Sequence, residues 1–147
     1  MDLILWRHAD AEDGADDAAR RLTPKGIKQA ARMAAWLDSR VAHNARMVIS
    51  PAVRAQQTAE ALARDASTSE QVKPGAEPRE LLQAAGWPGA TGTIIVVGHQ
   101  PTLGAAAALA LTGKAAPWRI RKAGVWWIST RGDGNPAVLA VMTPDLL

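Results

Sequence analysis

The segment LILWRHADAE, residues 3–12, joins four apolar residues directly to an arginine and a histidine. The apolar run does not alternate with polar residues, so residues 2–6 are predicted to form a strand that is covered on both faces, as in a parallel sheet. Such a strand lies in the middle of its sheet. Arg7 and His8 are then expected at the carboxyl end of the strand, which is where open α/β sheets bind their ligands.

Strands and helices are predicted to alternate along the rest of the chain. After a polar loop at 9–20, helices are expected at 24–40, 50–64 and 102–112 with a helical turn at 80–85, and strands at 46–49, 93–97, 118–129 and 137–142. Residues 65–79 are polar, with a short strand expected around Val72. This order predicts an α/β fold in three layers, a mostly parallel central sheet with helices on both faces. The last two strands are expected to form an antiparallel hairpin at one edge.

Two of the helices begin with the same signal, a hydroxyl residue followed by proline. Thr23 and Pro24 precede one helix, and Ser50 and Pro51 precede the next. A hydroxyl side chain caps the first backbone N–H groups, and proline fits the first helical position because it has no N–H to satisfy.

The composition narrows the class of protein. A chain of 147 residues, 48% of them hydrophobic, is expected to form a single domain, residues 1–147, with a substantial core. Cysteine is absent, which excludes disulfides, thiolate metal sites and a cysteine nucleophile. Neither a membrane-spanning run nor a signal peptide is recognised, so a cytoplasmic protein with no membrane partner is expected. The formal net charge of +3 favours anionic partners but is too small to indicate nucleic acid.

Three predicted strand or helix ends carry residues that can hold a phosphate. Arg7 and His8 end the first strand, Arg54 lies in the first turn of the helix that follows strand 46–49, and His99 follows strand 93–97. Arginine grips phosphoryl oxygens with two parallel hydrogen bonds. Arg54 is the most informative of the four, because a cation near a helix N-terminus opposes the helix dipole at a cost of about 0.3–1 kcal/mol. A bound anion would remove that conflict.

Each of these residues also has a purely structural interpretation. His8 could bond a backbone carbonyl, and His99 could be a turn residue after Gly98. The arginines could pair with carboxylates, Arg7 with Asp10 or Glu12 and Arg54 with Glu60 or another carboxylate. Together, however, these interpretations require four coincidences at one edge of the sheet.

Two arginines and two histidines suit phosphoryl transfer, in which catalysis is mainly positioning and charge stabilisation. One imidazole can attack phosphorus and form a covalent phosphohistidine, while the other donates a hydrogen bond to the phosphoryl oxygens. A metal site is disfavoured because the histidines show no metal-ligand spacing and the arginines would repel a dication. No metal and no other cofactor is therefore expected.

Four ordered motifs resemble those of the histidine phosphatase superfamily, the phosphoglycerate-mutase-like group. They are the strand ending in Arg7-His8, with alanine where the family has glycine, and LTPKG at 22–26, SPAVRAQQTA at 50–59 and VVGHQP at 96–101. The short chain and the opening RHADAE resemble the SixA-type phosphohistidine phosphatases in particular.

The resemblance implies a phosphoglycerate-mutase-like fold and a role for each site residue. His8 would be the nucleophile, and Arg7, Arg54 and His99 would complete the phosphate pocket. Larger members place an acidic general acid near the position of Glu80. SixA-type members do not depend on it, so Glu80 is assigned a supporting role, or else it is a solvated carboxylate at the start of a helix.

The resemblance predicts a metal-independent phosphatase that acts on phosphohistidine in a protein, of the phosphorelay or phosphotransfer type. No long insertion covers the predicted site, and an open site suits a phosphoprotein. Two alternatives stay open. One is a phosphomonoesterase for small phosphate esters, which needs an acid for an alkoxide leaving group. The other is a non-catalytic module that binds a phosphoryl group without turnover.

Overall fold

The computed structural model describes residues 1–147 and contains one six-stranded sheet. Its strands are β1 (Asp2–Arg7), β2 (Arg46–Ile49), β3 (Asp65–Thr68), β4 (Thr93–Gly98), β5 (Val125–Ser129) and β6 (Ala137–Met142), in the spatial order β3-β2-β4-β1-β5-β6. Strands β3, β2, β4 and β1 are mutually parallel, whereas β5 runs antiparallel to both β1 and β6. The predicted mostly parallel sheet and the antiparallel hairpin at its edge are both confirmed.

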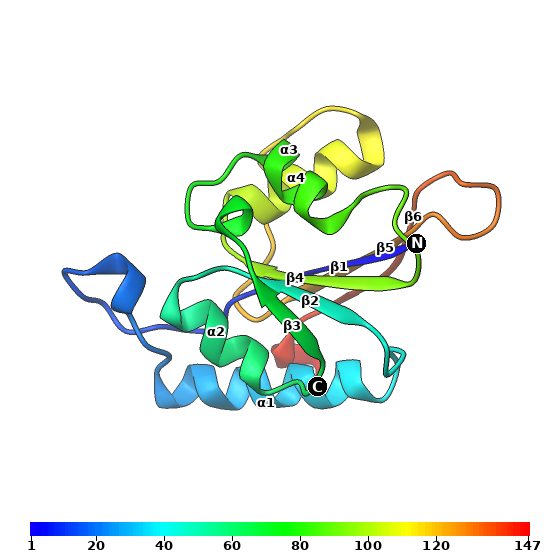
Figure 1. The fold of residues 1–147 in the computed structure, drawn as a ribbon. Helices are drawn as coiled ribbons and strands as arrows, with labels where there is room; N and C mark the ends of the chain where they lie inside the picture. The colour runs from blue at the N-terminus through cyan, green and yellow to red at the C-terminus, as the bar shows by residue number, and fades with distance from the viewer.

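Four helices cover the sheet in two layers (Figure 1). Helices α1 (Pro24–Asp38) and α2 (Val53–Glu60) lie on one face, and α3 (Pro78–Ala85) and α4 (Thr102–Thr112) lie on the other. Three short 3-10 segments complete the structure, η1 (Asp17–Ala19), η2 (Glu70–Val72) and η3 (Pro144–Leu146). The three-layer α/β fold predicted from the alternation of strands and helices is thus confirmed.

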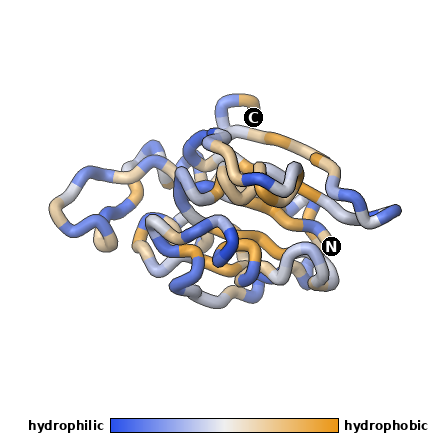
Figure 2. The backbone as a smooth tube through the Cα atoms, turned by 90° about the horizontal axis from the view of Figure 1, so that it is seen from above, coloured by the Kyte–Doolittle hydropathy of each residue, from blue (hydrophilic) through white to orange (hydrophobic).

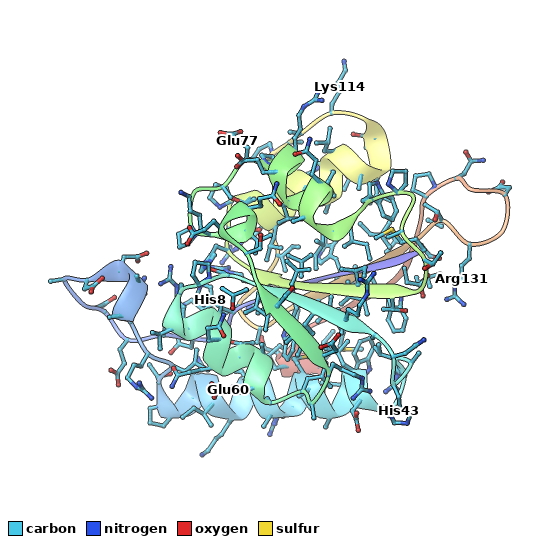
Figure 3. All side chains as sticks on the ribbon, in the orientation of Figure 1. His8, His43, Glu60, Glu77, Lys114 and Arg131 are labelled. Atoms are coloured by element: carbon cyan, nitrogen blue, oxygen red, sulfur yellow. The ribbon has the colours of Figure 1, made fainter.

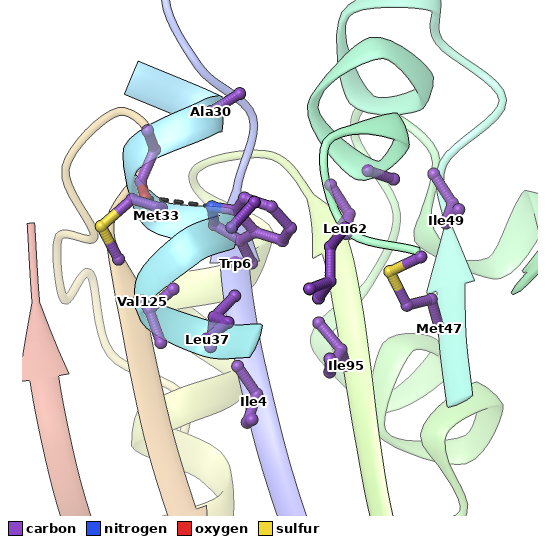
Figure 4. Packing of buried hydrophobic residues seen from close by; sticks show 14 of the residues in the cluster. Ile4, Trp6, Ala30, Met33, Leu37, Met47, Ile49, Leu62, Ile95 and Val125 are labelled. Carbon is purple, nitrogen blue, oxygen red and sulfur yellow. Dashed lines mark hydrogen bonds between the residues drawn. The ribbon is translucent and has the colours of Figure 1, made fainter. Parts of the chain in front are cut away.

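Strand β1 is the centre of both hydrophobic layers. Ile4 and Trp6 pack toward α1 and α2, and Leu3 and Leu5 pack toward α3 and α4, with no side-chain surface left exposed. Figure 4 shows Trp6 beside Met33 of α1, with its indole Nε1 donating a hydrogen bond to the Ala123 carbonyl at 3.1 Å. The absence of alternation in the sequence therefore reflects a strand that is buried on both sides.

Polar segments extend from the two ends of this core. The hydrophilic loops at 9–20 and 130–136 project in opposite directions, while the hydrophobic segments run through the middle of the molecule (Figures 1 and 2). No helix has the length and apolar character needed to cross a membrane.

The start of α1 explains the LTPKG motif. Thr23 is the N-cap, and its Oγ1 accepts a hydrogen bond from the Gly26 N–H at 3.0 Å, with Pro24 at the first helical position. A Cβ on Gly26 would lie 2.0 Å from the Asp10 carbonyl oxygen. Glycine is therefore required for the helix to pack directly against the backbone that follows β1.

Two predictions for the middle of the chain were wrong. The third strand lies at Asp65–Thr68, whereas Val72 lies in η2 with its side chain buried against the α3 layer. The side chains of β3 are all exposed, so the strand carries no hydrophobic pattern, and backbone pairing with β2 alone defines it. The helix predicted at 50–64 is shorter, Val53–Glu60. Ser50 does not cap it, because its Oγ accepts from the Ala52 N–H inside a turn.

The strand predicted at 118–129 begins only at Val125. The preceding residues form a loop that crosses the carboxyl end of β1. In this loop Ala123 has a positive φ of 58°, its N–H donates to the His8 carbonyl, and the Arg7 N–H donates to the Gly124 carbonyl. The backbone of this segment therefore holds the end of β1, and the pairing with β6 begins at Val125, opposite Met142.

Candidate active site

Four of the residues singled out from the sequence lie at the carboxyl edge of the sheet. Arg7 is the last residue of β1 and His8 follows it, His99 follows β4, and Arg54 is the second residue of α2. The His8 N–H donates to the Gly98 carbonyl at 3.1 Å, which places the two histidines on neighbouring strand ends. Their ring centroids are 5.1 Å apart.

The His8 ring is held in one orientation by hydrogen bonds at both nitrogens. Nδ1 lies 2.8 Å from the Ala9 carbonyl oxygen, so Nδ1 carries the proton and donates it to that carbonyl. Nε2 accepts a hydrogen bond from the Arg54 Nε at 3.3 Å. The lone pair of Nε2 therefore faces a guanidinium group. The backbone-carbonyl bond considered for His8 from the sequence is present and serves this orientation.

Arg54 is buried and lies between His8 and the loop that follows β1. Its Nη1 donates to the Asp17 carbonyl oxygen at 2.7 Å, and its Nη2 donates to the Asp17 carboxylate at 3.2 Å. The sequence suggested Glu60 or another carboxylate as a partner for this arginine, and the ion pair is made by Asp17, not by Glu60. The outer edge of the guanidinium is thus held by a carboxylate from the loop.

His99 and Arg7 each present a buried nitrogen that has no hydrogen-bond partner. His99 Nε2 lies 2.7 Å from the Ser50 hydroxyl, and its Nδ1 is unpartnered. Arg7 Nη1 donates to the Ile120 carbonyl at 2.9 Å, and its Nε is unpartnered. A buried donor without an acceptor costs about 1–3 kcal/mol, and an oxyanion at this edge would supply the acceptor. Arg7 pairs with neither of the carboxylates suggested from the sequence.

Burial dominates the ionisation of both histidines. The pKa of His8 is lowered to about 4, mainly by desolvation and also by the neighbouring Arg54 charge, although the bond to the Ala9 carbonyl opposes these effects. Desolvation, followed by the charge of His8, lowers the pKa of His99 to about 3. Both rings are therefore neutral near pH 7, and a phosphate dianion bound beside them would favour the protonated form of His99.

The structure does not bring Glu80 to these four residues. Its carboxylate accepts a hydrogen bond from the Glu77 N–H at 3.2 Å, and the two glutamates form a capping box at the start of α3. Figure 3 shows Glu77 in the α3 layer, well away from His8. Glu80 is therefore an exposed carboxylate at the start of a helix, which is the structural interpretation that the sequence analysis gave for it. A supporting role for Glu80 in catalysis stays a prediction.

Three residues that the sequence analysis did not assign to the site help to build it. Asp17 pairs with Arg54, Ser50 bonds His99, and the Thr58 hydroxyl accepts from the Ala9 N–H while donating to the Arg54 carbonyl. Ser50 and Thr58 belong to the SPAVRAQQTA motif, so the motif itself was a signal for them. For Asp17 the only signal was the run of acidic residues in the loop at 9–20.

The site can hold a phosphoryl group beside an unprotonated imidazole nitrogen. The Arg54 guanidinium contacts His8 Nε2, the His99 ring lies 5.1 Å from the His8 ring, and Arg7 precedes His8 at the end of β1, so two arginines are at hand to neutralise the charge of a phosphoryl group. No cluster of three or more histidine and carboxylate side chains has the arrangement needed to hold a metal ion.

Comparisons with known proteins agree with this site. The model of the histidine phosphatase superfamily (branch 1) matches residues 3–91. The phosphohistidine phosphatase SixA of Escherichia coli K12 is 31% identical over 127 residues, which cover 80% of this chain and 78% of that protein.

Solved structures show the same fold. The protein histidine phosphatase SixA in complex with tungstate superposes with a TM-score of 0.81 at 25% identity, with 99% of each chain covered. A phosphoserine phosphatase from Entamoeba histolytica, in complex with 3-phosphoglyceric acid, gives a TM-score of 0.69 at 20% identity, again with 99% of each chain covered. At that identity the second likeness concerns the fold alone.

The two buried histidines predict a loss of stability in mild acid. Their pKa values in the folded state, about 4 and about 3, lie below the ordinary value of 6.5. Folding is therefore not opposed by these histidines above pH 6.5, where they are neutral in both states. As the pH falls toward 4, the unfolded chain binds protons that the folded protein does not, and the free energy of unfolding decreases. Each histidine should lower the free energy of unfolding by about 2 kcal/mol between pH 7.5 and pH 5. Urea unfolding at a series of pH values measures this slope.

Two variants assign the slope to its source. His99→Asn keeps a polar partner for Ser50 and should make the slope shallower, whereas His43→Asn, at an exposed histidine, should leave it unchanged. Equal slopes for the wild type and His99→Asn would contradict the buried, neutral state of His99.

The Asp17 carboxylate is predicted to compete with phosphate for Arg54. Asp17→Asn removes the negative charge 3.2 Å from the guanidinium, so inorganic phosphate should bind about three- to tenfold more tightly. Isothermal titration calorimetry at low ionic strength measures the change. Asp16→Asn is the matched control, because Asp16 is exposed on the same loop and its side chain makes no hydrogen bond. Weaker binding to Asp17→Asn would mean that Asp17 orients Arg54 toward the anion.

Proposed function

Because this chain belongs to the histidine phosphatase superfamily, we propose that it hydrolyses phosphohistidine in a protein, with His8 as the nucleophile. The observation that carries the proposal is the state of His8. Its Nδ1 proton is held by the Ala9 carbonyl, and its Nε2 lone pair faces the Arg54 guanidinium at 3.3 Å. A non-catalytic phosphate site has no need for an oriented, unprotonated imidazole nitrogen beside an arginine.

In the first step, His8 Nε2 attacks the phosphorus of the substrate phosphohistidine. The phosphorus–nitrogen bond of the substrate breaks, and its electron pair returns to the substrate ring. When the other nitrogen of that ring carries a proton, the leaving group departs as neutral imidazole. No proton has to be delivered by the enzyme.

In the second step, water attacks the phosphorus that is now bonded to His8 Nε2. The bond to Nε2 breaks, and its electron pair returns to the ring, which keeps its proton on Nδ1 beside the Ala9 carbonyl. Both protons of the water stay with the product, dihydrogen phosphate, which then equilibrates with solvent. The hydrogen bond at Nδ1 therefore makes His8 a good acceptor in one step and a good leaving group in the next.

The remaining residues stabilise the charge of the phosphoryl group during both steps. Arg54 already contacts Nε2, and Arg7 and His99 each have a buried nitrogen available for a phosphoryl oxygen. Removing one such donor from an active site typically costs about a hundredfold to a thousandfold in rate.

The leaving group explains why Glu80 is not needed for this substrate. An imidazole has a reference pKa of about 6.5, far below that of an alcohol, so it leaves without a general acid. An alkyl phosphate has no such advantage. The site, with Glu80 held by its own helix, therefore favours phosphohistidine over small phosphate esters. We expect the protein to act in the cytoplasm.

The first test is phosphate release from a histidine-phosphorylated protein in the presence of EDTA. The wild type should release phosphate at an undiminished rate with the chelator, and His8→Ala should reduce the rate by about a thousandfold or more. His43→Ala is the control, since His43 is exposed and remote from the site. Thermal unfolding confirms that each variant is folded.

Other outcomes point to different functions. Full activity of His8→Ala would exclude the nucleophile. Release only from alkyl phosphates, with a large loss in Glu80→Gln, would indicate a phosphomonoesterase for small esters. Stabilisation by phosphate without turnover of any substrate would indicate a binding module.

A further inference from the structure

A second feature of the same sheet edge shares only Arg7 with the chemistry described above. A cleft of about 290 Å³ opens beside Arg7, between the start of α1, the loop before β5 and the C-terminal segment. The charged side chains that line it are five cations and one carboxylate: Arg7, Lys25, Arg119, Arg121, Lys122 and Asp145. We refer to it as the cationic cleft.

The positive charge of the cationic cleft is only partly neutralised. Lys122 pairs with Asp10 at 2.7 Å, and Arg121 pairs with Asp145 at 3.4 Å. The five cations exceed these two carboxylates by three charges, which equals the formal net charge of the whole chain, +3. Lys25 and Arg119 form no ion pair. The other charges of the chain therefore sum to zero, and the excess positive charge at the cleft attracts an anionic partner.

The cationic cleft is joined to the phosphate site through Arg7 and the loop before β5. Arg7 lines the cleft, and its Nη1 donates to the Ile120 carbonyl between Arg119 and Arg121. The same loop bonds the backbone of Arg7 and His8 through Gly124 and Ala123. A partner whose phosphohistidine reaches His8 therefore places its neighbouring residues over this cleft.

We propose that the cationic cleft binds acidic side chains that flank the phosphohistidine on the protein substrate, an inference that rests on the proposed function. The cations there are exposed on long stems, with Arg121 66% and Lys122 50% exposed, so they can adjust to carboxylates on a partner surface. No aromatic side chain lines the cleft, and stacking on aromatic rings is the usual way to hold the bases of single-stranded nucleic acid. These features favour an acidic protein surface.

The test uses two synthetic peptides that carry the same phosphohistidine. In one peptide the flanking residues are glutamates and in the other they are glutamines, while phosphoramidate serves as a substrate with no flanking residues. The variant combines Lys25→Glu and Arg119→Glu, which change the two cations without an ion pair and leave Arg7 intact. Lys114→Glu makes one such charge reversal at an exposed lysine on the far side of the sheet (Figure 3) and controls for the effect of each single substitution on the charge of the chain.

The double variant should lower kcat/KM for the glutamate peptide by about tenfold at low ionic strength, and less at high salt. Its kcat/KM for the glutamine peptide and for phosphoramidate should stay within about twofold of the wild type, as should all values for Lys114→Glu. Equal losses on the two peptides would overturn the proposal. So would a loss on phosphoramidate, which would place these cations in the phosphate chemistry.

A binding measurement separates this proposal from the proposed function. Fluorescence anisotropy of the unphosphorylated peptides should show that the wild type prefers the glutamate peptide and that the double variant does not. If no substrate is hydrolysed but the wild type still prefers the glutamate peptide, the proposed function is wrong, whereas the binding of acidic side chains by the cationic cleft is supported. A different result would overturn the proposal: the wild type shows no preference between the peptides, and the double variant loses binding to a single-stranded oligonucleotide. The cleft would then be a site for nucleic acid.

Discussion

Hydrogen bonding along both edges of β1 fixes Arg7 and His8, and the rest of the site is assembled around that fixed point. The strand is paired with β4 on one side and β5 on the other, and both of its faces are buried. Neither residue can shift without breaking the backbone bonds to Gly98 and Gly124. Helix α2 is tied to the same point, because Thr58 links the Ala9 backbone to the Arg54 carbonyl. A buried strand is thus a rigid support for a nucleophile at its end.

The burial that makes this support rigid also makes the site costly in stability. His8 and His99 are kept neutral by desolvation, which lowers their pKa values to about 4 and about 3, and two buried nitrogens nearby have no partner. A phosphoryl group would reverse both effects, since it accepts hydrogen bonds from those nitrogens and favours protonation of His99. Without an anion the site therefore contains buried nitrogens that lack hydrogen-bond partners, and a bound anion would supply those partners.

The parts of the molecule that follow short-range patterns could be predicted from the sequence. The unbroken apolar runs gave β1 and β4, and Thr23-Pro24 gave the start of α1, so the meeting of His8, His99 and Arg54 at one edge was predictable. Long-range pairing could not be predicted in the same way. Strand β3 exists through its backbone bonds to β2, and Asp17 reaches Arg54 across 37 residues. The loop before β5 was mistaken for a strand because its hydrogen bonds to the end of β1 leave no trace in residue type.

The central claim is that His8 Nε2 accepts the phosphoryl group. The most direct measurement is to mix the protein with a histidine-phosphorylated substrate, quench in alkali, which preserves phosphohistidine, and locate the phosphoryl group by peptide mass spectrometry. The account predicts a transient phosphoryl group on the peptide that contains His8 and none on the peptide that contains His99. Phosphate release from the substrate with no phosphoryl group on His8 at any time, or with the group on His99, would contradict it.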